Sequence, residues 1–174
     1  DGQQVRACFL PDYIVMKLTG EGPMTDPTNG GGSGVFDVSG GNWNKPLIEK
    51  LGLRTEVFPP VGKSCARAGG LMAEAARSLG LPAGISVAVE CGDNQASFAG
   101  SVCNPASSLL INIGTGAQVS AWVPKTILVP GVDTRPHLDG GFLLVGAPLC
   151  GGLSYALLRD FFRSIGRSFF SAAG

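Results

Sequence analysis

One stretch near the middle of the chain decides the predicted fold: Ile85-Ser86-Val87-Ala88-Val89-Glu90-Cys91-Gly92-Asp93-Asn94-Gln95-Ala96. Its first six residues are mostly β-branched or small and nearly uncharged, which is typical of a buried strand. The residues from Asn94 onward suit a helix that begins directly after this strand. The pattern therefore predicts a strand-to-helix turn that places Asp93 at the carboxyl end of the strand, at or near the helix cap.

Two glycine loops follow this turn along the chain. Strand-like runs over residues 109–113 and 117–122 flank Gly114-Thr115-Gly116, which predicts a hairpin. A third strand, over 141–145, leads through Gly151-Gly152 into an amphipathic helix over 154–165. We therefore expect a second α/β unit to begin after residue 106.

The residues before position 85 predict three helices, over 11–18, 46–51 and 71–79. Each is followed by a glycine that can end it, namely Gly20, Gly52 and Gly80. Between the first two helices, residues 25–34 have the composition of turns. Residues 140–158 carry no charge, which approaches the length of about 20 residues that spans a membrane. Because this stretch holds five glycines and a proline, a strand, a loop and a helix fit it better than one span.

Composition excludes several classes of protein. The 174 residues carry 13 Lys+Arg and 13 Asp+Glu, so the zero net charge gives no reason to expect nucleic acid or an anionic membrane as a partner. Hydrophobic residues make up 44% and charged residues 15%, which excludes a disordered chain. The chain begins without Met and ends just after an apolar helical pattern, and we interpret it as an internal fragment of a longer protein.

Five cysteines without Cys-x-x-Cys spacing predict reduced, buried thiols in a cytosolic protein. A single histidine and scattered thiols do not supply four zinc ligands, so no metal site is predicted. The sequence also lacks the P-loop, the dinucleotide-binding glycine fingerprint and the nucleophile elbow.

What remains for chemistry is Asp93 and the two glycine loops. Asp93 at a sheet edge suits a ligand cleft, but a helix cap explains it equally well, and position alone favours the cap. Gly114-Thr115-Gly116 would allow close approach of a phosphate, and its alternative is an ordinary hairpin turn. Gly151-Gly152 could bring a helix N-terminus to a nucleotide, or only permit tight packing. The 31 residues from Asn94 to Pro124 carry no charge, so the sequence predicts no cation beside Asp93.

The order of these motifs resembles the central part of the FGGY carbohydrate kinases, in the actin-like ATPase superfamily. The resemblance rests on Gly92-Asp93-Asn94-Gln95-Ala96, Asn112-Ile113-Gly114-Thr115-Gly116, and Gly146 through Gly152 before Arg159-Asp160. Upstream segments agree, among them Thr25-Asp26-Pro27-Thr28-Asn29 and Gly80-Leu81-Pro82-Ala83-Gly84. Within the family, Arg135-Pro136-His137-Leu138-Asp139-Gly140 is most similar to the sedoheptulokinase branch. At Gly30-Gly31-Gly32 the chain departs from the family's Ala or Ser, which predicts a frayed element there.

The resemblance implies an α/β protein with the ribonuclease H-like/actin-like ATPase fold, as a fragment spanning the end of the first domain and the start of the second. Residues 1–103 would be the C-terminal part of the N-terminal, sugar-binding domain. Residues 107–174 would be the N-terminal part of the C-terminal, nucleotide-binding domain.

The same resemblance implies ATP-dependent phosphorylation of a sugar hydroxyl, with a ketose such as sedoheptulose as the acceptor. Asp93 would be the catalytic base and would bind the sugar together with Asn94. Gly114, Thr115 and Gly116 would contact the ATP phosphates, and Gly152 would lie by the adenosine. The implied cofactors are ATP and Mg²⁺, the implied location is the cytoplasm, and a homodimer is compatible with the full-length protein.

Other acceptors remain open at this point, namely xylulose, ribulose and glycerol. So does a non-catalytic actin-like module that binds a nucleotide, and so does a purely structural α/β fragment. Because the family's N-terminal phosphate-binding segment is absent, we expect the fragment itself to be inactive.

Overall fold

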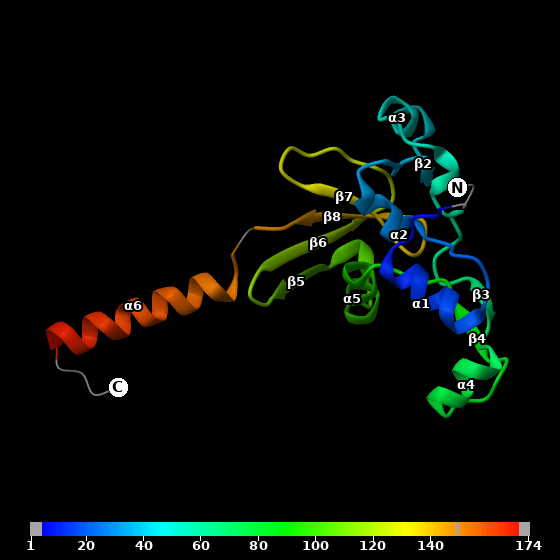
Figure 1. Ribbon diagram of the computed structural model, residues 1–174. Coiled ribbons are helices and arrows are strands. Elements are labelled where there is room, and N and C mark those ends of the chain that lie inside the picture. Colours follow the sequence, from blue (N-terminus) through cyan, green and yellow to red (C-terminus); the bar gives the residue numbers. More distant parts are fainter. Residues whose placement is uncertain (1–4, 149, 171–174) are drawn as a thin grey trace.

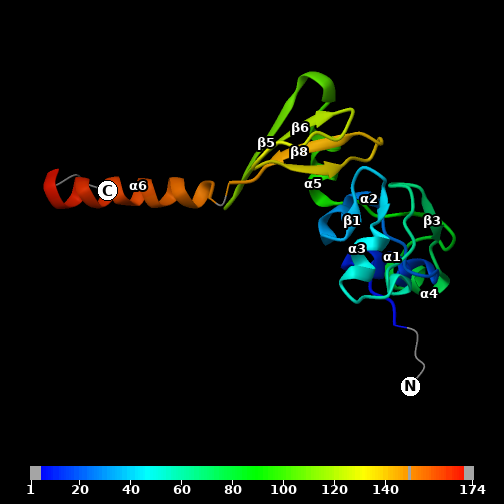
Figure 2. The ribbon, with the colours of Figure 1, turned by 90° about the horizontal axis from the view of Figure 1, so that it is seen from above.

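The computed structural model describes residues 5–148 and 150–170 of the chain. Helices and short two-stranded ladders make up the part before residue 103, and a four-stranded sheet follows (Figure 1). The last helix extends away from the sheet (Figure 2). The α-helices are α1 (Leu10–Thr19), α2 (Pro27–Gly30), α3 (Lys45–Lys50), α4 (Ala73–Leu79), α5 (Asp93–Ser101) and α6 (Gly152–Phe170). The 3-10 helices are η1 (Gly31–Ser33), η2 (Thr55–Val57) and η3 (Pro105–Ser107). The strands are β1 (Phe36–Asp37), β2 (Asn42–Trp43), β3 (Arg67–Gly70), β4 (Ser86–Ala88), β5 (Leu109–Ile113), β6 (Ala117–Val123), β7 (Asp133–Pro136) and β8 (Phe142–Gly146).

The three helices predicted upstream are confirmed, and their ends follow from local chemistry. α1 and α4 stop at Gly20 and Gly80, whose φ angles of 76° and 67° lie in the left-handed region that glycine adopts most easily. Asn44 caps α3, because its Oδ1 accepts a hydrogen bond of 3.1 Å from the backbone N–H of Leu47.

The segment predicted as a run of turns is helical instead. Asp26 caps α2, and its carboxylate accepts a 2.9 Å hydrogen bond from the backbone N–H of Asn29. The three glycines expected to fray the element complete α2 and begin η1. A Cβ on Gly31 would lie 2.8 Å from Cδ of Pro136, so glycine at this position lets η1 pack directly against β7.

The strand before Asp93 is shorter and more exposed than predicted. It comprises Ser86–Ala88 and pairs antiparallel with β3. Ser86 and Ala88 are exposed and Val87 is half-buried, so the prediction of a buried strand over 85–90 was wrong. Among the described residues, β3 is the only strand paired with β4, so no further strand shields it from solvent.

The glycine hairpin and the third strand of the second unit are confirmed. β5 and β6 pair antiparallel from Leu109↔Ala121 to Ile113↔Ala117, and β8 pairs with β6. The sheet order is β5-β6-β8-β7, with β7 at one edge, a strand that the sequence did not predict. Helix α5 packs one face of the sheet, where Phe98 lies in a core with Leu143 and Val145.

The opposite face of the sheet and the last helix are uncovered. Leu109, Ile111 and Ile113 of β5 are exposed, and α6 buries none of its residues. No helix within residues 5–148 and 150–170 is both long and apolar enough to cross a membrane. The uncharged stretch over 140–158 divides into β8, a loop and the start of α6, as predicted; Leu149 lies outside the described residues.

The cysteines are free thiols, but they are not buried as predicted. Cys8, Cys65, Cys103 and Cys150 are exposed and Cys91 is half-buried. All five lie in loops or turns outside the helices and strands. The prediction of burial was wrong because apolar neighbours in the sequence do not by themselves place a cysteine in the core.

Candidate functional site

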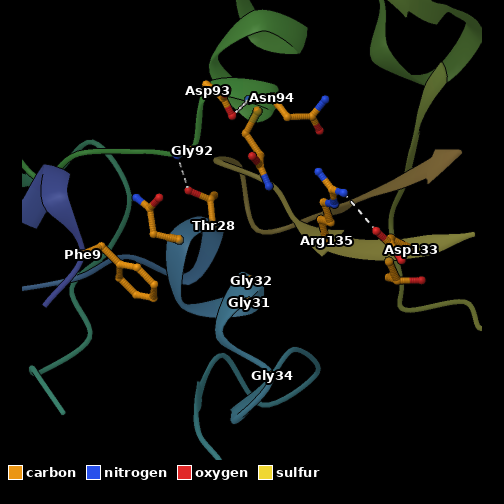
Figure 3. Close-up of a pocket in the computed structure, with 13 residues that line it drawn as sticks. Phe9, Thr28, Gly31, Gly32, Gly34, Gly92, Asp93, Asn94, Asp133 and Arg135 are labelled. Atoms are coloured by element: carbon orange, nitrogen blue, oxygen red, sulfur yellow. Dashed lines mark hydrogen bonds and ion pairs between the residues drawn. The ribbon is translucent and has the colours of Figure 1, made fainter. Parts of the chain in front are cut away.

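A pocket of about 610 Å³ lies between the first part of the chain and the edge of the four-stranded sheet (Figure 3). Asp93 and Asn94, at the start of α5, form one side of it, and Asp133 to Arg135 of β7 form another. The full lining is Phe9, Thr28, Asn29, Gly31, Gly32, Gly34, Gly92, Asp93, Asn94, Gln95, Asp133, Thr134 and Arg135.

Asp93 is the first residue of α5 and not its cap, which corrects the simplest structural interpretation of this carboxylate. Gly92 is the N-cap residue, and no side chain caps the helix. Asp93 is exposed at the pocket, and its Oδ1 accepts a hydrogen bond of 2.7 Å from the backbone N–H of Asn94. The second carboxylate oxygen therefore stays available to a ligand hydroxyl.

Asn94 connects the start of α5 to the sheet. Its Nδ2 donates to Oε1 of Gln118 at 3.0 Å and lies 3.4 Å from Oγ of Ser120, both on β6. The residue is 7% exposed, and its Oδ1 has no hydrogen-bond partner among the described residues. A buried amide oxygen without a partner is costly, so this oxygen is a candidate acceptor for a hydroxyl group of a ligand that reaches it.

A buried hydrogen-bond relay holds the loop that carries Asp93. The hydroxyl of Thr28 donates to the Asp26 carboxylate at 2.8 Å and accepts from the backbone N–H of Gly92 at 2.7 Å. Asp26 is fully buried, and Ser64 Oγ also donates to it at 2.5 Å. The relay therefore ties Gly92, the residue before Asp93, to the start of α2. Sequence analysis missed this link because Thr28 and Gly92 are 64 positions apart in the chain.

The pocket also holds a cation that the sequence did not predict beside Asp93. Arg135 comes from β7, beyond the uncharged stretch that follows Asp93, and its Nη2 donates to Oδ2 of Asp133 at 2.9 Å. Figure 3 shows Arg135 across the pocket from Thr28 and Gly92, with its guanidinium directed toward Asn94. The antiparallel β7–β8 pairing brings it there, and that pairing left no periodic signal in the sequence.

The two predicted glycine loops lie against each other. The backbone N–H of Gly152 donates to the carbonyl oxygen of Gly114 at 2.8 Å, and that of Gly151 donates to Thr115 at 3.1 Å. A Cβ on Gly152 would lie 2.6 Å from the same Gly114 oxygen, so only glycine fits this close approach.

The loops do not line the pocket that contains Asp93. They adjoin it through β6, because Gln118, the partner of Asn94, lies two residues beyond Gly116, or about 7 Å along a strand. Gly114, Thr115 and Gly116 are exposed, so their backbone could be reached by a phosphate. The backbone N–H of Gly114 is not free for such a contact, because it donates to the carbonyl oxygen of Gly116 at 2.8 Å.

A second carboxylate cluster lies just behind the Asp93 loop. Burial, followed by the adjacent Asp12 carboxylate and to a smaller extent Asp26, raises the pKa of the Glu90 carboxyl to about 8. Asp12 is fully buried, and its Oδ2 accepts a 2.8 Å hydrogen bond from the backbone N–H of Phe9. Glu90 is therefore neutral at pH 7 and can lie beside Asp12 without the repulsion of a second negative charge.

No group of three or more His, Cys, Asp or Glu side chains suited to a metal ion occurs in the part of the chain that the structure describes. His137 is 8% exposed, and its Nδ1 lies 2.9 Å from Oδ1 of Asp139. Its ring meets that of Phe98 edge-on, with the centroids 5.6 Å apart. The histidine therefore supports the β7–β8 turn and the core.

Comparison with known proteins gives a consistent result. Residues 3–100 match the family model described as the FGGY family of carbohydrate kinases, N-terminal domain. An autoinducer-2 kinase of Yersinia enterocolitica is 33% identical over 158 residues, which cover 88% of this chain and 30% of the relative. The chain thus spans about a third or less of the length of the relatives it matches.

Two solved structures share the fold at low sequence identity. A xylulose kinase from Rhodospirillum rubrum superposes with a TM-score of 0.81 at 24% identity, over 90% of this chain and 32% of that one. A gluconate kinase from Lactobacillus acidophilus superposes with a TM-score of 0.79 at 22% identity, over 86% of this chain and 30% of that one. The likeness to these two structures concerns the mixed α/β fold alone.

Proposed function

Since this chain belongs to the FGGY family of carbohydrate kinases, we propose that the full-length protein transfers the terminal phosphoryl group of ATP to a hydroxyl group of a small polyhydroxylated acceptor. One observation carries the proposal. An exposed carboxylate, on Asp93, lines the same pocket as Asn94, whose amide oxygen has no hydrogen-bond partner among the described residues, and two mutually packed glycine loops adjoin this pocket.

In this proposal Asp93 and Asn94 bind the acceptor. The Asp93 carboxylate orients the reacting hydroxyl and takes its proton as the oxygen attacks phosphorus. The Asn94 oxygen accepts a hydrogen bond from a neighbouring acceptor hydroxyl, which fixes the acceptor relative to Asp93. The relay through Thr28 and Asp26 holds the loop in the position that this requires.

Gly114, Thr115 and Gly116 would contact the phosphates of ATP, and Gly152 would lie by the adenosine. ATP, when bound, supplies the phosphoryl group, and Mg²⁺ offsets its negative charge. The tight packing of Gly152 on Gly114 supports this assignment, since it brings the two loops together and excludes a side chain at Gly152.

We further propose the domain division that the motifs suggested. Residues 1–103 belong to the sugar-binding domain and residues 107–174 begin the nucleotide-binding domain, both of ribonuclease H-like architecture. The change from helices and short ladders to a four-stranded sheet supports this division. We propose that the nucleotide-binding domain includes more than residues 107–174. The exposed apolar residues of β5 and α6 support this, and so does the share of the relative's length, 30%, that the chain covers.

For the acceptor we propose a neutral ketose. Sedoheptulose was suggested by residues 135–140, but the relatives described above are named for autoinducer-2, xylulose and gluconate. The comparisons thus give no support to sedoheptulose over other ketoses, and it becomes one member of a panel. The family relation also supports a cytoplasmic location, where ATP is available.

The test is acceptor-dependent release of ADP by the full-length protein. The panel comprises xylulose, ribulose, sedoheptulose, glycerol, autoinducer-2 and gluconate, each measured against a blank without acceptor. We expect at least one neutral acceptor to accelerate ADP release well above the blank. Binding of ATP with no acceleration by any member would instead indicate a nucleotide-binding module without kinase activity.

A further inference from the structure

The wall of the pocket opposite Asn94 carries an ion pair whose role the proposed function does not explain. Asp133 and Arg135 are two residues apart on β7, so their side chains leave the same face of the strand. Nη2 of Arg135 donates to Oδ2 of Asp133 at 2.9 Å, and both residues line the pocket.

Stability does not account for this pair. Its side chains are 33% and 66% exposed, and ion pairs exposed to this degree contribute little to folding. The guanidinium group has five N–H donors, and among the described residues its hydrogen bonding involves only Asp133 through Nη2. Most of its hydrogen-bonding capacity is therefore available to a molecule in the pocket.

The charge of the lining selects the kind of molecule. Asp93, Asp133 and Arg135 are the only charged residues among those that line the pocket, and together they give it one net negative charge. A sugar acid would bring a second negative charge close to Asp93, which is unfavourable in a partly enclosed site. A neutral polyol or ketose brings no such penalty.

The geometry of the pair fits adjacent hydroxyl groups. The guanidinium presents donors and the Asp133 carboxylate presents acceptors side by side, while each hydroxyl can donate and accept. Asp93 and Asn94 lie on another wall of the same pocket, so an acceptor that reaches both walls is held at two points.

We propose that Arg135 and Asp133 form a specificity-determining pair, which binds adjacent hydroxyl groups at the end of the acceptor remote from Asp93 and selects neutral sugars over sugar acids. This inference rests on the proposed function, because it concerns the acceptor of the same reaction. Arg135 acts by positioning the acceptor and does not take part in proton transfer.

The experiment compares the full-length protein with its Arg135→Met, Arg135→Lys and Asp133→Asn variants. D-xylulose, D-ribulose and sedoheptulose are the neutral probes and D-gluconate is the acidic probe. The matched control is Arg159→Met, which removes a similarly exposed ion pair, 2.8 Å from Asp160, on α6 and away from the pocket.

Arg135→Met should raise KM for the neutral probe with the highest kcat/KM by about 10- to 100-fold, the value expected for lost hydrogen bonds to a charged group. kcat at saturation and KM for ATP should stay within about threefold of wild type, because positioning at a remote hydroxyl affects binding first. Arg135→Lys should recover only part of the affinity, since an ammonium group cannot donate in a planar fork. Asp133→Asn leaves the lining with no net charge. This variant should therefore have a smaller ratio of kcat/KM for the neutral probes to kcat/KM for D-gluconate than wild type has.

A readout on the substrate side separates positioning from a structural effect. A 1-deoxy-D-xylulose probe keeps the C5 hydroxyl as the phosphoryl acceptor and lacks the C1 hydroxyl at the opposite end, so its KM should respond to Arg135→Met less than the KM of D-xylulose does. Equal KM increases for both probes, or an unchanged KM for every neutral probe, would overturn the inference. The proposed function would still stand in that case, provided that the wild-type protein shows acceptor-dependent ADP release. Absence of acceptor-dependent ADP release in the wild type would overturn the proposed function and the inference with it.

Discussion

Replacing Thr28 with valine removes one hydroxyl at a buried position without changing the shape of the side chain. The hydroxyl makes two hydrogen bonds, one to the Asp26 carboxylate at 2.8 Å and one from the backbone N–H of Gly92 at 2.7 Å. The second bond is the direct link between the start of α2 and the loop that carries Asp93. The substitution therefore tests whether this loop is held in place by the relay.

The expected loss of stability follows from these two bonds. A hydrogen bond to a charged group contributes about 1.5–3 kcal/mol, and a buried N–H left without a partner costs about 1–3 kcal/mol. Asp26 keeps Ser64 and two donors of Asn29, so the lower part of the summed range applies. We expect Thr28→Val to lower the local stability of the loop by about 2.5–4 kcal/mol.

The assay is amide hydrogen exchange of the segment 91–100 in the full-length protein, with kcat measured in parallel. Faster exchange in this segment should accompany a fall in kcat of about 10- to 100-fold, because a misplacement of about 1 Å is enough to slow an oriented reaction. Thr28→Ser keeps the hydroxyl and should behave almost as wild type. Thr55→Val is the matched control, since it removes an exposed hydroxyl that bonds to a carboxylate, that of Glu56, away from the pocket. Unchanged exchange and unchanged kcat in Thr28→Val would refute the role of the relay.

Two further predictions follow from the cluster behind the loop and from the packed glycines. Because burial and the neighbouring Asp12 raise the pKa of Glu90 from 4.5 to about 8, the folded protein loses stability as the pH rises between these values. Glu90→Gln should therefore unfold at a higher temperature than wild type near pH 8.5 and at a similar temperature near pH 4.5. If the unfolding temperatures of the variant and wild type differed by the same amount at both pH values, that result would contradict the pKa shift. Gly152→Ala should weaken ATP binding at least about tenfold in a calorimetric titration, since its Cβ would lie 2.6 Å from the carbonyl oxygen of Gly114. Gly146→Ala, where a Cβ meets no atom within 4 Å, is the matched control and should bind ATP as wild type does.

The parts of the fold that were predicted from sequence depend on local chemistry. Helix ends at Gly20 and Gly80 were predictable because glycine adopts positive φ at little cost, and both residues do so. The hairpin at Gly114 to Gly116 was predictable because two strand-like runs with few charges flank a short glycine turn.

The parts that were missed depend on contacts between distant residues. β7 is four residues long and contains Asp, Arg and Pro, so neither its periodicity nor its composition marks it as a strand. Its pairing with β8 brings Arg135 into the pocket with Asp93, which no local pattern indicates. β4 was predicted to be buried from its apolar composition, but burial depends on which strands lie beside it, and only β3 does so among the described residues.

The central claim is that Asp93 acts on the acceptor hydroxyl. Asp93→Asn keeps the size of the side chain and its ability to accept the hydrogen bond from Asn94, but it cannot take up the hydroxyl proton. Measured in the full-length protein with its best acceptor, this variant should lose about 10²- to 10⁴-fold in kcat while its dissociation constant for ATP stays within about threefold of wild type. A variant that keeps more than about a tenth of the wild-type kcat would contradict the assignment of Asp93 as the base.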